Sequence, residues 1–97
     1  MTAAIAGRLK DLHIEVMAEA NGYCLFARGD ALALVKCSGE GFGEIGSTGL
    51  MTGRGLAYLV WRDGAPMLSC RGDEFPAEPP QLETIRRFSE ELKAALK

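Results

Sequence analysis

The sequence predicts a single α+β domain over residues 1–97. An antiparallel β-meander of about five strands is flanked by an N-terminal and a C-terminal helix, in the order α-β-β-β-β-β-α and in two layers. Three observations predict this fold. Apolar residues recur at helical spacing at both ends, apolar runs joined by turn residues occupy the middle, and the length suits one core.

The first element is predicted as a helix over about residues 3–20, because apolar residues recur there every three or four positions. Thr2 can cap its start, and Asn21-Gly22 supplies the left-handed residue that commonly ends a helix. Such a helix would carry an acidic row of Asp11, Glu15 and Glu19, which is interpreted as a solvated face. A basic partner or a weakly held cation is the alternative for this row.

Two hairpins are predicted next. Residues 23–28 and 31–37 flank Gly29-Asp30, in a register that places Cys24 opposite Val35 and Phe26 opposite Ala33. Residues 56–61 and 65–70 flank a turn at Asp63-Gly64, in a register that places Tyr58 opposite Ser69, Leu59 opposite Leu68 and Val60 opposite Met67. Both faces of this second hairpin are apolar.

Between the hairpins, residues 39–55 are rich in glycine and are predicted as a broken strand. Ser47, Thr48 and Arg54 are candidates for a small anion site, in which backbone N–H groups and a guanidinium would meet a phosphate or carboxylate. The segment lacks the GxxxxGK[ST] pattern of a P-loop.

The last element is predicted as a helix that begins near Pro80, since proline suits a first turn. Its apolar stripe consists of Leu82, Ile85, Phe88, Leu92 and Leu96. Opposite charges four positions apart mark its solvated side.

Composition and charge narrow the function classes. The net charge is −2 and the basic residues are dispersed, so nucleic-acid binding is not expected. No apolar run reaches the length of a membrane span and no signal peptide is apparent, which favours a cytoplasmic protein without membrane contact. Cys24, Cys37 and Cys70 are expected to be buried free thiols in a reducing compartment. His13 is the single histidine and is interpreted as structural. The sequence therefore predicts no metal site, no cofactor and no catalytic residue.

The second hairpin carries the main functional hypothesis. Helices cover one face of a sheet, so an apolar face remains, unless curvature of the sheet buries both. We expect the exposed set to consist of Tyr58, Val60 and Met67, with Phe26 next to it. The alternative exposed set consists of Leu59, Trp61 and Leu68. The sequence thus predicts a small non-catalytic interaction or regulatory module that forms a homodimer through this face. The alternative is a binder of a small anionic ligand, or a minor enzyme, that uses residues 39–55 with Tyr58 or Cys70 lining the pocket.

Overall fold

The computed structural model describes residues 2–39 and 41–97. Over these residues the chain forms two helices and seven strands: α1 (Ala3–Asp11), β1 (Glu15–Ala20), β2 (Tyr23–Arg28), β3 (Ala31–Ser38), β4 (Gly41–Thr52), β5 (Gly55–Arg62), β6 (Ala65–Cys70), β7 (Asp73–Pro76) and α2 (Pro79–Ala95). Each strand pairs antiparallel with the next, in the sheet order β1-β2-β3-β4-β5-β6-β7. The predicted α+β meander between two helices is confirmed, with seven strands in place of about five. Neither described helix combines the length and the hydropathy needed to cross a membrane.

The N-terminal helix is shorter than predicted, because α1 ends at Asp11. His13 takes a left-handed φ of 59° and turns the chain into β1, where Glu15 and Val16 already pair with β2. Asn21 and Gly22 both have positive φ and form the tight turn between β1 and β2. The sequence signal that was interpreted as a helix end is therefore a hairpin turn, a conformation that also favours Asn-Gly.

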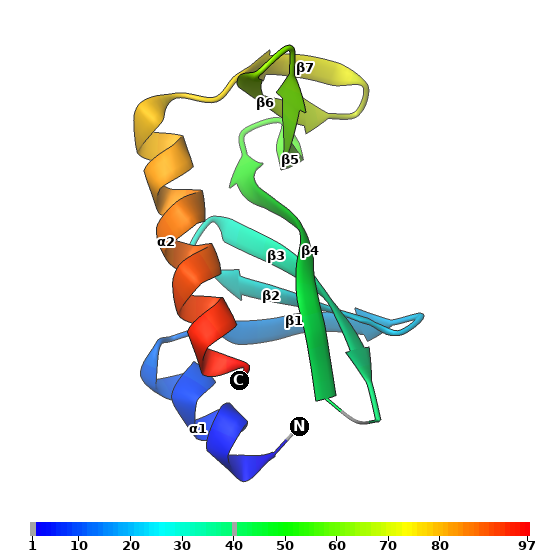
Figure 1. Cartoon of the computed structure of the whole chain (residues 1–97). Helices are drawn as coiled ribbons and strands as arrows, with labels where there is room; N and C mark the ends of the chain where they lie inside the picture. Colours follow the sequence, from blue (N-terminus) through cyan, green and yellow to red (C-terminus); the bar gives the residue numbers. More distant parts are fainter. Residues whose placement is uncertain (1, 40) are drawn as a thin grey trace.

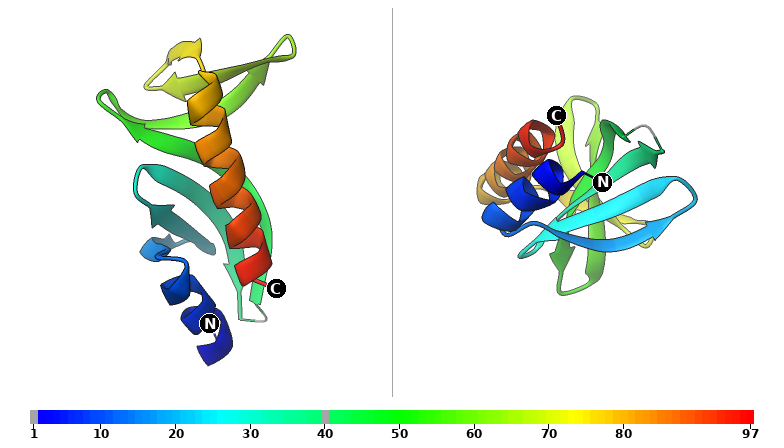
Figure 2. Two further views of the ribbon diagram at one scale, coloured as in Figure 1. Left: turned by 90° about the vertical axis from the view of Figure 1, so that its left-hand side faces the viewer. Right: turned by 90° about the horizontal axis from the view of Figure 1, so that it is seen from below.

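The sheet is strongly twisted, and α2 lies along it (Figure 1). The hairpin strands β1 to β3 lie near the chain ends, β5 to β7 lie at the opposite end, and the long strand β4 connects the two regions. Helix α2 packs against β3 and β4, and its last turn meets α1. The two chain ends, marked N and C, lie at the same end of the molecule (Figure 2). There the Arg8 side chain donates to the carbonyl oxygens of Ala95 at 3.0 Å and Lys97 at 2.6 Å.

The core lies between α2 and the sheet face that it covers. Its largest fully buried side chains come from three strands and from the helix: Phe26, Val35, Leu68, Phe88 and Leu92. The predicted stripe of the C-terminal helix is confirmed, since Ile85, Phe88 and Leu92 are buried and Leu82 and Leu96 pack against the core. Glu78 and Gln81 form a capping box at the start of this helix.

Strand β4 is continuous over twelve residues, where a broken strand was expected. Its pairing with β3 is nonetheless irregular, with register shifts on either side of Val35. A Cβ atom at Gly49 would lie 2.1 Å from the carbonyl oxygen of Ala57 on β5. Glycine therefore permits the close approach of β4 and β5 where the sheet bends.

Candidate functional site

Alternation along the strands divides the sheet into two faces. The inner face packs against α2 and carries Phe26, Ala33, Val35, Leu50, Ala57, Leu59 and Leu68. Both helices contribute buried residues to this inner core, Leu9 from α1 and Ile85, Phe88, Leu92 and Ala95 from α2. The opposite side, called here the outer face, carries the residues that alternate with the inner set.

Tyr58, Val60 and Met67 lie on the outer face. Val60 pairs with Met67 and Tyr58 with Ser69, in the register that the sequence predicted for this hairpin. The helices thus cover the set that contains Leu59 and Leu68, and the set favoured as an interface faces away from them. All three side chains are half-buried within one chain.

Phe26 does not belong to this surface, and its assignment as an interface residue is wrong. It pairs with Ala33, has no exposed area and packs edge-on against Phe42 with ring centroids 5.6 Å apart. The register Phe26–Ala33 was predicted correctly, and it already placed both residues on one face. The link from that face to the face of Leu59 depends on the pairing of β3, β4 and β5, which the sequence did not supply.

The outer face has an apolar centre. Besides the three half-buried residues it carries Tyr23, Leu25, Leu32, Leu34, Met51 and Leu56, placed there by the pairing of Leu25 with Leu34 and of Met51 with Leu56. Tyr23 and Met51 are 41% and 49% exposed. Leu32 is buried even though it lies on this side. Curvature of the sheet therefore hides part of the outer face, as the alternative hypothesis anticipated, and leaves the remainder accessible.

Charged residues lie at the margins of the outer face. Lys36 is exposed beyond Leu34 on β3. At the other end Arg62 of β5 and Glu74 of β7 form an ion pair across β6, with an N–O distance of 2.8 Å. The hydrogen bonds from Arg62 hold the pKa of the Glu74 carboxyl below its usual value. An apolar centre with a charged margin is the layout of a protein–protein interface.

The structure does not bring together the three residues predicted for an anion site. Ser47 is exposed, Thr48 pairs with Ala33 in the middle of β4, and Arg54 lies in the turn after that strand. Thr48 and the end of β4 at Thr52 are separated by about 13 Å of extended strand. One small anion therefore cannot contact Ser47, Thr48 and Arg54 together, and the predicted site needs correction.

Arg54 is instead engaged in local contacts. Its guanidinium lies over the Phe75 ring, 5.3 Å from the centroid, and its carbonyl oxygen accepts from the Cys70 thiol at 3.5 Å. Cys70 thus does lie beside Arg54, whereas Tyr58 points to the outer face. Of Tyr58 and Cys70, the two alternatives expected to line the pocket, Cys70 is therefore the one that lies near Arg54.

The acidic row and the histidine also need correction. Asp11 ends α1, whereas Glu15 and Glu19 belong to β1, so the three carboxylates do not share a helix face. His13 lies beyond the helix, in a left-handed conformation. The next residue, Ile14, is only 5% exposed and donates its backbone N–H to the carbonyl oxygen of Leu9 at 2.9 Å.

A cleft of about 690 Å³ opens between α1, the last turn of α2 and the ends of β1 to β4. Cys24 and Cys37 face this cleft on the inner side of the sheet, with their sulfur atoms 3.2 Å apart. Burial, followed by the hydrogen bond and the charge of Cys37, raises the pKa of the Cys24 thiol to about 11. Glu19 lies opposite Cys24 on the edge strand β1.

Sequence reasoning missed this cluster of two thiols and a carboxylate. The signal for the thiols was present, because the predicted register set Cys24 opposite Val35 and so placed Cys37 two residues further along the same face. Glu19 was hidden by its assignment to a helix. The cluster therefore combines residues that the sequence analysis treated separately.

Comparisons with models of known protein families, with curated proteins and with solved structures gave no match. The functional inferences that follow depend on the geometry of this chain.

Proposed function

We propose that this protein is a small non-catalytic interaction module that forms a homodimer through its outer face. The observation that carries the proposal is the set of apolar side chains on the outer face, which consists of the half-buried Tyr58, Val60 and Met67 and the more exposed Tyr23 and Met51. Large apolar side chains gathered on one face of a small domain usually mark a surface that a partner covers.

A second copy of the chain is the partner that fits this surface best. A domain of this size buries a smaller fraction of its surface than a larger domain does, so self-association supplies further burial. A two-fold axis brings the same patch of both copies together, so apolar centres meet and charged margins meet water.

The assembly is tested by light scattering after size-exclusion chromatography over a concentration series. We expect the mass of a dimer for the unmodified protein and the mass of a single chain for Val60→Asp. A carboxylate at this position would lose its hydration in the interface, which opposes dimer formation. Met51→Asp gives the same test at a side chain that is 49% exposed and therefore tolerates a charge in the folded monomer.

Trp61→Ser is the matched control. Trp61 is 60% exposed and apolar, but it alternates with Val60 and belongs to the other side of β5. This variant should remain dimeric. A wild-type protein that is monomeric at every concentration would contradict the proposed dimer. The proposed surface would also be wrong if Trp61→Ser were monomeric while Met51→Asp remained dimeric.

A further inference from the structure

We propose that Glu19, Cys24 and Cys37 form a binding site for a thiophilic divalent cation, and that Zn²⁺ is the ion that this donor set fits. The site was not expected from the sequence, which led to the prediction of no metal site. It lies on the inner side of the sheet, at the end near the chain termini, and it is independent of the outer face that carries the proposed dimer.

The donor atoms are close enough to share one ion. The two Sγ atoms and a Glu19 carboxylate oxygen all lie within 4.8 Å of one another. Tetrahedral zinc with Zn–S bonds of about 2.3 Å places two sulfur ligands about 3.8 Å apart. The observed separation of 3.2 Å between the sulfurs therefore needs to widen by only about half an ångström, which small rotations of the two side chains supply.

The three ligands stand on adjacent paired strands. Glu19 of β1 pairs directly with Cys24 of β2, and the turn at Asn21 and Gly22 fixes this pairing. The Cys37 N–H of β3 donates to the carbonyl oxygen of Gly22 at 2.8 Å, which ties the third ligand to the same turn. Ligands held on paired strands keep their relative positions better than ligands on loops.

Electrostatics favour a cation at this point. Cys24 is buried and its thiol donates to the sulfur of Cys37. If both thiols lost their protons, the two thiolates and the Glu19 carboxylate would repel one another unless a positive charge lay between them. A bound cation replaces the thiol protons and reverses that repulsion. The exposed Glu19 side chain can rotate toward the sulfurs, because β1 is an edge strand whose residues are exposed.

The donor set selects the ion. Two sulfur ligands disfavour Mg²⁺ and Ca²⁺, which prefer oxygen, and the carboxylate disfavours Cu⁺. Zinc accepts thiolate and carboxylate together. A fourth position would face the adjoining cleft, where water or a donor group of another molecule can complete the tetrahedron. The bound ion would also link β1, β2 and β3, and so fasten the exposed edge strand to the sheet.

The test is a Co²⁺ titration of the reduced protein without oxygen, followed by displacement with Zn²⁺. We expect thiolate-to-cobalt charge-transfer absorption that saturates at one ion per chain and disappears when Zn²⁺ is added. Cys24→Ser and Cys37→Ser should each abolish that absorption. Glu19→Gln should weaken Co²⁺ binding by about tenfold or more, since loss of a group that merely orients a ligand already costs that much.

Cys70→Ser is the matched control, because Cys70 is also a buried thiol but lies on β6 beside the carbonyl of Arg54. It should keep the full absorption. The site is refuted if reduced wild-type protein gives no charge-transfer band, or if Cys70→Ser removes it. Unchanged affinity in Glu19→Gln, whose exposed side chain leaves folding intact, likewise overturns the three-ligand site. If the reduced protein does not bind Co²⁺ but forms a Cys24–Cys37 disulfide in air, the two cysteines are a redox pair, which also contradicts the proposal.

Discussion

Individual residues set the closest contacts of this fold, and Gly49 gives the sharpest case. We expect Gly49→Ala to lower the free energy of unfolding by about 2 kcal/mol or more, because the added Cβ would lie 2.1 Å from the Ala57 carbonyl oxygen and one strand backbone must move. Urea denaturation measures the loss. Gly53→Ala is the matched control: among the described residues, nothing approaches the position of its Cβ within 4 Å, so a change within about 0.5 kcal/mol is expected.

Equal losses in the two glycine variants would contradict this explanation. Such a result would mean that chain flexibility at the bend, rather than contact with Ala57, sets the cost of a side chain in β4.

The Cys24 thiol makes stability depend on alkaline pH. Its pKa is raised from 9.0 to about 11 in the folded chain, first by burial and then by Cys37. The unfolded thiol therefore ionises first as the pH rises. This contribution to stability is complete below about pH 9 and is lost progressively between pH 9 and 11. Urea denaturation at pH 8 and at pH 10 should show a larger decrease for the metal-free wild type than for Cys24→Ala. An identical decrease in both proteins would exclude Cys24 as its source.

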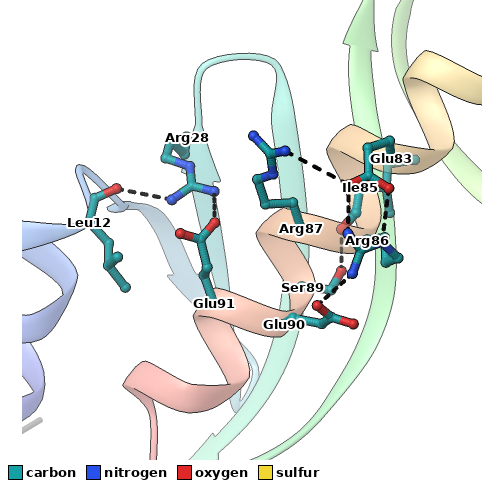
Figure 3. Close-up of polar contacts among 9 residues, drawn as sticks. All are labelled: Leu12, Arg28, Glu83, Ile85, Arg86, Arg87, Ser89, Glu90 and Glu91. Atoms are coloured by element: carbon teal, nitrogen blue, oxygen red, sulfur yellow. Dashed lines mark hydrogen bonds and ion pairs between the residues drawn. The ribbon is translucent and has the colours of Figure 1, made fainter.

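At the scale of secondary-structure elements, Arg28 joins β2 to both helices (Figure 3). It donates to the Leu12 carbonyl oxygen after α1 at 3.2 Å and to the Glu91 carboxylate on α2 at 2.6 Å. Its guanidinium also lies 5.5 Å from the centroid of the Phe88 ring. These contacts connect three elements that are far apart in the sequence.

We expect Arg28→Ala to lower stability by about 1–3 kcal/mol, because it removes a charged hydrogen bond to each helix. Glu91→Gln should cost less, about 0.2–1 kcal/mol, since both partners of this ion pair are partly solvated. Chemical denaturation of the two single variants and the double variant measures their coupling.

Arg86→Ala is the control for the arginine. Arg86 pairs with Glu83 and Glu90 on the same helix (Figure 3), and these three side chains are between half and two-thirds exposed. A change within about 0.5 kcal/mol is expected, because exposed pairs within a helix stabilise little. If Arg86→Ala lowered the free energy of unfolding as much as Arg28→Ala, the result would contradict a special role of Arg28 in joining β2 to the two helices.

At the scale of the whole molecule, a dimer built on the outer face makes thermal stability depend on protein concentration. Each tenfold rise in concentration should stabilise the folded dimer by about 1.4 kcal/mol. Differential scanning calorimetry should therefore show a rising Tm for the wild type and for Trp61→Ser. The Tm of Met51→Asp should stay constant. A constant Tm for the wild type would contradict the dimer.

Several parts of this organisation could be predicted from the sequence because local signals specify them. The hairpins of β2–β3 and β5–β6 have turn residues that fix their registers, and both registers are as predicted. The C-terminal helix follows from prolines at its start and from an apolar stripe with helical spacing. The Tyr58, Val60 and Met67 surface could be identified as one of two sets, since alternation on β5 and β6 separates them.

Other features were decided by tertiary contacts. Residues 15–20 continue the helical spacing of apolar residues, and pairing with β2 made them a strand. The burial of Phe26, and its removal from the proposed surface, depended on how β4 aligns the first hairpin with the second.

The sequence alone therefore determined the order of the helices and the strands of both hairpins, since turn residues and periodicity act over a few neighbouring positions. Only the tertiary structure decided which sheet face the helices cover, that Ser47 and Thr48 lie apart from Arg54, and that Glu19 meets Cys24 and Cys37. These outcomes depend on strand pairing and sheet twist, which bring together residues that no local pattern relates.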